Sequence, residues 1–291
     1  MEQLRQSAQT LIEALPYIRQ WSGKTVVVKY GGNAMTDDAL KRSVAEDLVL
    51  LHYVGIKVVA VHGGGPAINS MMERLGLESR FVAGLRVTDA PTMEVAQMVL
   101  VGQINQELVS LVNACGGKAV GLSGKDANLI RCRKIEHPAG DLGFVGDIVS
   151  MDCSVIDTLT DAGYIVVISS IGVGDEGESY NINADTVAGD LAGALKAEKL
   201  VTLSDVRGIF RDIKDESSLL SKLSLDEARE LMKSEIISKG MIPKLQSCIS
   251  ALEKGVSRAH MIDGRVPHAI LMELFTDQGI GTMLEGQPTP W

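Results

Sequence analysis

The chain has 291 residues, 45% of them hydrophobic and 22% charged, which is typical of a globular protein with one large α/β domain or two lobes. Its net charge of −9 argues against non-specific nucleic-acid binding, because neutralising phosphates takes a basic face. The four cysteines are far apart, so we expect reduced thiols and no zinc site. The first 20 residues lack the apolar core of a signal peptide, and no uninterrupted apolar run has the length of a membrane span. We therefore expect a cytoplasmic protein.

Residues 1–22 form the first predicted element, an amphipathic helix. Its apolar residues recur at the spacing that gathers them on one helical stripe. Pro16 breaks the hydrogen-bond ladder, which predicts a kink or a break near Leu15. The stripe can pack on its own subunit or against another copy of the chain, and the pattern leaves both open.

Two apolar runs, 25–30 (TVVVKY) and 58–61 (VVAV), predict strands that are buried on both faces of a parallel sheet. Each run leads into glycines, Gly31-Gly32 and the HGGGP segment at 62–66. Glycines let backbone N–H groups approach a ligand, and at a helix start such groups favour an anion. Lys29 lies at the carboxyl end of the first strand, where open α/β sheets bind ligands.

The glycine segment has two other interpretations besides an anion site. A glycine run can be no more than a tight strand-to-helix turn. An HGGG segment also forms part of the oxyanion hole in some α/β-hydrolases, but these need a G-x-S-x-G elbow. The nearest candidate, 121–125 (GLSGK), has lysine in place of the last glycine, which argues against a hydrolase.

Helices are predicted at 38–54 and 66–75, so the first part of the chain alternates strand and helix as βαβ units do. The polar segment 84–89 (GLRVTD) then precedes a long helix at 93–114, with Thr88 or Asp89 as its cap. Arg86 in this segment is either a surface cation or a clamp for a carboxylate, whose geometry the planar guanidinium matches.

Three short alternating runs at 118–123, 129–134 and 144–149 predict hairpin-like strands beside the main sheet, as a lid over a substrate. A further buried strand at 164–170 precedes GVGDEG, which matches G-x-G-x-x-G. We do not expect a dinucleotide there, because two acidic residues would repel the pyrophosphate and the next helical pattern begins only near Ala184.

The later part of the chain carries two charged residues at helix starts. Asn183 is a predicted N-cap, and Asp185 in the following turn either complements the helix dipole or holds active-site lysines. Lys244 follows a Gly…Pro helix start, where a cation is unfavourable unless an anion joins it. The other expected elements are strands at 199–203 and 259–262, helices at 225–232 and 240–252, and an edge strand at 282–284.

Six segments occur in an order and spacing that resemble the acetylglutamate kinases of the amino-acid kinase family: KYGGNAM, HGGGPAIN, GLRVTDAPTMEV, YNINADTVA, LSDVRGIF and GMIPK. The resemblance covers residues 25–285. It implies a three-layer αβα sandwich around a largely parallel sheet, with an N-terminal lobe (23–195) for the amino-acid substrate and a C-terminal lobe (196–291) for ATP. The implied reaction is phosphorylation of the side-chain carboxylate of N-acetyl-L-glutamate, in arginine biosynthesis.

The resemblance also implies roles for individual residues. Lys29 and Lys244 would stabilise the transferring phosphoryl group and Asp185 would orient them. The substrate would be bound by Gly64, Gly65, Arg86 and Asn181, and the nucleotide by Gly32 and Asp205. Mg²⁺ would be held by the phosphates of ATP, with no protein ligand. The carboxylate nucleophile is already ionised at pH 7, so no general base is expected.

Regulation is implied as well. Family members with such an N-terminal helix resemble arginine-inhibited hexamers, in which kinked helices interlace dimers, and Tyr17, Glu273 and Gly279 would contribute to the arginine site. The sequence does not indicate whether a PII-type signalling protein binds, and 287–291 has no assignable role. Two alternatives stay open: a carbamate, glutamate or aspartate kinase of the same family, and a catalytically silent binding protein on the same scaffold.

Overall fold

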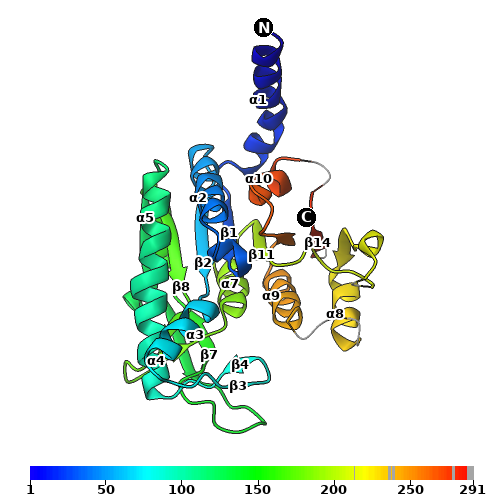
Figure 1. The fold of residues 1–291 in the computed structure, drawn as a ribbon. Coiled ribbons are helices and arrows are strands. Elements are labelled where there is room, and N and C mark those ends of the chain that lie inside the picture. Colours follow the sequence, from blue (N-terminus) through cyan, green and yellow to red (C-terminus); the bar gives the residue numbers. More distant parts are fainter. Residues whose placement is uncertain (213, 235–236, 238–239, 277–278, 287–291) are drawn as a thin grey trace.

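An eight-stranded sheet forms the centre of the computed structural model, which describes residues 1–212, 214–234, 237, 240–276 and 279–286 (Figure 1). The tail 287–291 lies outside the described residues. All neighbouring strands are parallel except β14, which is antiparallel to β13. In spatial order the strands are β12 (Lys222–Ser224), β14 (Thr282–Glu285), β13 (Arg258–Asp263), β11 (Lys199–Ser204), β1 (Thr25–Tyr30), β2 (Lys57–His62), β8 (Ile165–Ser169) and β5 (Ala119–Ser123).

The register of β1 and β2 explains why both glycine segments meet. Tyr30 pairs with His62, so the chain leaves both strands at the same edge of the sheet. The valines of the two strands alternate between the two faces of the sheet, and all of them are fully buried, as the apolar runs predicted.

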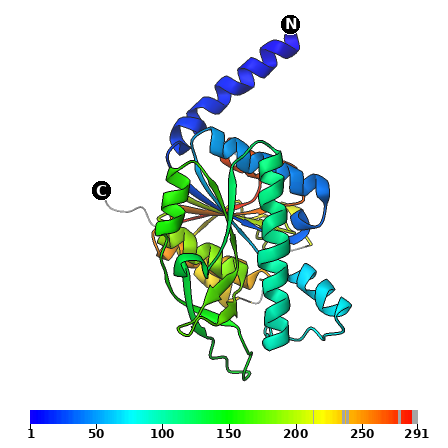
Figure 2. The ribbon, with the colours of Figure 1, turned by 90° about the vertical axis from the view of Figure 1, so that its left-hand side faces the viewer.

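Helices cover both faces of the sheet, so the predicted three-layer αβα sandwich is confirmed (Figure 2). Alternate side chains of each central strand point to opposite faces of the sheet and pack into two separate hydrophobic cores, one under each helical layer. One layer contains α2 (Asp38–Tyr53), α5 (Gln106–Ala114) and α10 (Ala269–Leu274). The other contains α6 (Ser154–Asp161), α7 (Ala184–Ala194), α8 (Leu225–Lys233) and α9 (Ile242–Glu253).

The carboxyl ends of the parallel strands are covered by smaller elements (Figure 1). They comprise α3 (Gly65–Arg74), the hairpin β3 (Phe81–Val82) and β4 (Leu85–Arg86), and a second sheet with the order β10 (Ser179–Asn181), β9 (Ile171–Val173), β6 (Ile130–Lys134) and β7 (Gly146–Met151). Three 3₁₀ turns complete the connections: η1 (Gly32–Met35), η3 (Asp126–Asn128) and η4 (Glu216–Ser218).

A long helix, Ala90–Ala114, joins α4 (Ala90–Gln97) to α5 through a π-helical segment, η2 (Met98–Asn105). Asp89 is its N-cap and accepts a hydrogen bond from the Thr92 amide at 3.0 Å. By length and composition alone this helix is apolar enough to cross a membrane. Its buried side chains pack on α3 and on the main sheet, as those of a core helix do.

Two expectations about the sheets need correction. The run at 118–123 is not part of a hairpin: β5 pairs in parallel with β8 at the edge of the main sheet. The two other runs do form the antiparallel pair β6–β7. β14 is not an edge strand, because the unpredicted three-residue β12 lies outside it. The segment 172–177 begins in β9 and continues into the turn toward the antiparallel β10, so it opens no helix.

The N-terminal helix α1 (Glu2–Trp21) projects from the body of the molecule in both views. Pro16 lies inside it without breaking it, and Figure 2 shows the axis turning toward its C-terminal end. Trp21 anchors the base: its Nε1 donates to Leu274 O at 3.1 Å, and Lys199 Nζ lies 4.2 Å from its ring centre. Four large apolar side chains of the helix are exposed: Leu4, Leu11, Ile12 and Leu15.

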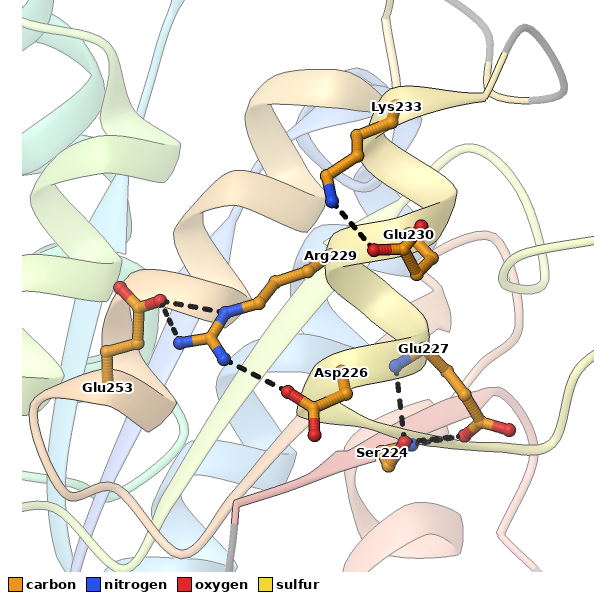
Figure 3. Close-up of polar contacts among 7 residues, drawn as sticks. All are labelled: Ser224, Asp226, Glu227, Arg229, Glu230, Lys233 and Glu253. Atoms are coloured by element: carbon orange, nitrogen blue, oxygen red, sulfur yellow. Dashed lines mark hydrogen bonds and ion pairs between the residues drawn. The ribbon is translucent and has the colours of Figure 1, made fainter.

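A polar network fixes α8 against α9 (Figure 3). Ser224 and Glu227 form a capping box at the start of α8. Arg229 then bridges Asp226 on its own helix, at 3.0 Å, and Glu253 on α9, at 2.7 Å. These exposed pairs are each worth less than about 1 kcal/mol, but together they orient the helix that carries Lys244.

Candidate active site

Three charged residues from three separate elements meet at the carboxyl edge of the sheet. Lys29 Nζ, from β1, lies 3.0 Å from Asp185 Oδ1. Lys244 Nζ, from the first turn of α9, lies 3.0 Å from Asp185 Oδ2. The side chains of Lys29 and Asp185 are only 7% and 9% exposed, and that of Lys244 is 20% exposed. The structure therefore brings together the three residues predicted to be catalytic.

Burial and charge act against one another in this triad. Burial lowers the pKa of Lys29, and the nearby Lys244 adds to this, while the Asp185 carboxylate opposes it. Burial alone would raise the pKa of Asp185, but the two ammonium groups outweigh it and hold that pKa below its usual value. Asp185 thus stays ionised and keeps two positive charges close together.

Local sequence explains how the triad is held. Asn183 caps α7, as predicted: its side-chain oxygen accepts a hydrogen bond from the backbone N–H of Asp185 at 2.8 Å. Ser247 of α9 donates to the carbonyl of Asp185. A Cβ on Gly189 would lie 2.5 Å from the Ser247 carbonyl oxygen, so this glycine allows α7 and α9 to approach.

A cavity of about 200 Å³ opens beside the triad. Six of the predicted site residues line it: Lys29, Gly64, Gly65, Arg86, Asn181 and Asp185. The glycine segment forms one wall, where Gly64 is the N-cap of α3 and the helix start leaves N–H groups without intrahelical partners. A Cβ on Gly64 would lie 2.3 Å from Ile104 Cδ1, whereas Gly65 faces open space.

Arg86 is a buried residue of β4, not a surface cation. Its Nη2 donates to Asn69 Oδ1 at 2.7 Å and to the Gly65 carbonyl at 3.1 Å, and Nη1 donates to Ser79 Oγ at 3.1 Å. The guanidinium also lies 4.7 Å from the ring centre of Phe81. Its orientation at the rim of the cavity is therefore fixed.

Sequence reasoning missed these three supports of Arg86. Asn69 lies one helical turn after Gly65, at the end of the HGGGPAIN segment, so helical spacing could have indicated it. Ser79 and Phe81 lie in a loop and a two-residue strand, where no periodic pattern exists.

Asn181 and the two residues predicted to bind the nucleotide, Gly32 and Asp205, occupy different positions. Asn181 Nδ2, on β10, donates to Thr88 Oγ1 at 3.3 Å. Gly32 has a left-handed φ of +68°, and a Cβ there would lie 2.3 Å from Asp205 Oδ1, so these two residues are adjacent. Neither lines the cavity beside the triad. Gly31, the residue before Gly32, lies next to the triad, because a Cβ there would lie 2.5 Å from Lys29 Nζ.

The three residues assigned to inhibitor binding lie elsewhere, at the base of α1. The ring centres of Tyr17 and Phe275 are 6.4 Å apart. Glu273 accepts a hydrogen bond from the backbone N–H of Ile280 at 2.7 Å. A Cβ on Gly279 would lie 3.0 Å from Glu273 Oε1. Tyr17 and Glu273 therefore flank the same junction, and none of the three lines the cavity.

Known proteins resemble this chain over nearly its whole length. The sequence model of the amino acid kinase family matches residues 24–263. A protein of Thermoanaerobacter pseudethanolicus named acetylglutamate kinase is 57% identical over 277 residues, 95% of this chain and 92% of that protein. One of the same name from Heliobacterium modesticaldum is 56% identical over 288 residues, 96% and 98% of the two chains.

Solved structures show the same fold. N-acetylglutamate synthase from Neisseria gonorrhoeae, complexed with coenzyme A and N-acetyl-glutamate, superposes with a TM-score of 0.86 at 29% identity, over 97% of this chain and 64% of that one. Carbamate kinase from Giardia lamblia, bound to AMP-PNP, gives 0.65 at 20% identity, over 91% and 99%, a likeness of fold alone. The chain therefore belongs to the amino acid kinase family, within which it groups with the acetylglutamate kinases, as its motifs predicted.

Proposed function

We propose that the chain uses ATP to phosphorylate the side-chain carboxylate of N-acetyl-L-glutamate, giving N-acetyl-L-glutamyl 5-phosphate in arginine biosynthesis. One observation carries the proposal: the Lys29–Asp185–Lys244 triad lies beside a cavity whose rim holds the fixed guanidinium of Arg86. Such a site can gather an acidic amino-acid derivative and a phosphate. The relatives named acetylglutamate kinase support this choice of substrate.

The chemistry needs positive charge and positioning, not a base. An oxygen of the ionised carboxylate attacks the γ-phosphorus, and the bond to the bridging oxygen of ADP breaks. Negative charge spreads over the equatorial phosphoryl oxygens, where Lys29 and Lys244 stabilise it. Asp185 keeps both ammonium groups at the required distance from each other.

The other residues bind the two substrates. The amides of Gly64 and Gly65, with Asn181, bind N-acetyl-L-glutamate, and Arg86 pairs with its carboxylate. Gly32 offers its amide to the phosphates, and Asp205 begins the nucleotide contacts. Lys29 and Asp185 belong to the proposed lobe 23–195 and Lys244 to the proposed lobe 196–291, so the site lies where the two lobes join.

Mg²⁺ fits this site as a partner of the nucleotide. Among the described residues, no three His, Cys, Asp or Glu side chains gather to hold a metal ion, and both oxygens of Asp185 face lysines. We propose that the phosphate oxygens would be its ligands and that Mg²⁺ would neutralise part of their charge.

Assembly and regulation follow from α1. Its exposed apolar residues support a homo-oligomer. The resemblance to arginine-inhibited family members leads us to propose a cytoplasmic hexamer in which these helices join dimers. The junction of Tyr17, Glu273 and Gly279 is the proposed site at which arginine inhibits the enzyme.

A coupled assay for ADP release tests the function. We expect turnover with N-acetyl-L-glutamate, ATP and Mg²⁺ and much less with glutamate, aspartate or carbamate. Lys29→Ala and Lys244→Ala should each lower kcat by about 100-fold or more. Lys254→Ala, which removes an exposed lysine paired with Asp190 at the end of α9, is the matched control and should leave kcat unchanged. Near-normal turnover in both site variants would refute the assigned roles.

A further inference from the structure

His62 is a fully buried residue immediately before the glycine segment, and none of the roles above uses it. Its Nδ1 lies 3.0 Å from the Gly63 carbonyl oxygen, and its Nε2 lies 3.2 Å from Asn105 Nδ2. Burial lowers the pKa of His62 to about 4, so the imidazole is neutral at pH 7.

Asn105 determines which ring nitrogen of His62 carries the proton. Asn105 Nδ2 lies 3.1 Å from the Val167 carbonyl oxygen and 3.4 Å from that of Leu122. Carbonyl oxygens can only accept hydrogen bonds, so the NH₂ of the Asn105 side chain, and not its oxygen, faces these two carbonyls. An NH₂ group only donates, so Nε2 of His62 can face it only as an acceptor. The two hydrogens of the NH₂ group are shared among three acceptors, of which the Leu122 carbonyl is the most distant. The proton is therefore on Nδ1, which donates to the Gly63 carbonyl.

The surrounding fold is shaped around this pair. Asn105 ends the π-helical segment η2, and such segments are frequent at functional sites. Two other side chains of η2, Leu100 and Ile104, press against Gly64. On β5, a Cβ at Gly121 would lie 1.8 Å from Asn105 Oδ1, so only glycine leaves space for the amide.

The hydrogen bond to the Gly63 carbonyl fixes more than one atom. The carbonyl of Gly63 and the N–H of Gly64 belong to one planar trans peptide group and point in opposite directions. Neither glycine has a Cβ to resist rotation of this plane. Gly63 N–H donates to the Tyr30 carbonyl at 3.4 Å, so with His62 in place both ends of Gly63 are held.

We propose that His62 and Asn105 are positioning residues: the neutral imidazole holds the Gly63–Gly64 peptide plane so that Gly64 N–H faces the cavity and can bind the amino-acid substrate. Asn105 in turn holds the imidazole in the tautomer that donates to Gly63. This inference rests on the proposed function, because it assigns a purpose to the glycine amide within the same site.

Two variants of His62 separate its two hydrogen bonds. The side-chain nitrogen of Asn can take the place of Nδ1 as a donor, and the side-chain oxygen of Gln can take the place of Nε2 as an acceptor. His62→Gln therefore loses the bond to Gly63, and its KM for N-acetyl-L-glutamate should rise about 10- to 100-fold. His62→Asn keeps that bond, and its KM should stay within about threefold of the natural enzyme. The KM for ATP should change little in either variant.

A purely structural role would give a different pattern. Each variant loses one of two buried hydrogen bonds, so the two melting temperatures should fall by similar amounts. Equal KM values in the two variants, or KM values that follow the melting temperatures, would overturn the proposal.

If the variants fail to fold, a measurement on the natural enzyme still tests the proposal. Nitrogen NMR of the ring, assigned through the backbone, should show His62 as the Nδ1–H tautomer at pH 7. The Nε2–H tautomer or an imidazolium would overturn the proposal. If the natural enzyme does not turn over N-acetyl-L-glutamate, the proposed function fails, whereas the tautomer and its contact with Gly63 are tested independently.

Discussion

Replacing Asp185 by Asn tests whether one carboxylate holds both ammonium groups in place. The change keeps the shape of the side chain and removes its charge, which leaves the buried Lys29 beside a second cation with no counter-ion. Breaking a buried pair by removing one partner costs about 3 to 5 kcal/mol. Since Asn still accepts one hydrogen bond, we expect the lower figure, which lowers Tm by roughly 6 to 9 °C.

The same variant should change the pH dependence. Burial already lowers the pKa of Lys29 while Asp185 opposes that shift, so without Asp185 the pKa falls further. Lys29 loses its charge as pH rises through its lowered pKa, so the alkaline limb of kcat/KM should begin at lower pH in the variant. Because deprotonation relieves the buried charge, the loss of stability should be largest at neutral pH and shrink as pH rises.

Thermal melting at pH 7 and pH 9.5, together with the coupled assay across that range, measures both effects. Asp190→Asn is the matched control, because Asp190 lies on the same helix and its partner Lys254 is 46% exposed. It should cost less than about 1 kcal/mol and leave the pH profile unchanged. An Asp185→Asn variant with the melting temperature and alkaline limb of the natural enzyme would refute the reasoning.

Four further predictions follow from the geometry. Arg86→Lys keeps the charge but loses the planar fork, so the KM for N-acetyl-L-glutamate should rise about tenfold in the coupled assay. Gly32→Ala places a Cβ in a left-handed conformation against Asp205, so a titration should show weaker ATP binding and melting a loss of about 1 to 2 kcal/mol. Burial raises the pKa of Asp47 from 3.8 to about 6, so the native state loses stability as pH rises from about 4 to 6, and the melting temperature of Asp47→Asn should rise relative to that of the natural enzyme over that range. Deleting residues 1–20 should reduce the assembly to dimers by light scattering and weaken arginine inhibition, and an unchanged mass would contradict the role of α1.

The central strands could be predicted because their composition leaves few alternatives. The run TVVVKY matches β1 residue for residue, since unbroken β-branched residues fit a strand buried on both faces. β5 was misplaced because its five residues alternate weakly, and pairing partners depend on contacts with distant β8. β12 has three residues, too few for any period to show.

The meeting of the three proposed catalytic residues was predictable in part because each lies near the end of an element. Lys29 ends a strand, and Asp185 and Lys244 begin helices, so topology alone brings them to one edge. The supports are different. Asn69 and Ser79 around Arg86, and Asn105 beside His62, contact their partners only through tertiary packing, which no local pattern encodes.

The triad has a consequence for how charge is supplied during the reaction. Lys29 and Lys244 repel each other, and the folding of the chain around Asp185, not the arrival of a ligand, overcomes that repulsion. The positive electrostatic potential is thus preorganised, with little solvent left to reorient when negative charge develops on a phosphoryl group. An incoming phosphate shares the lysines with Asp185, and so it meets a field whose strength was set when the protein folded.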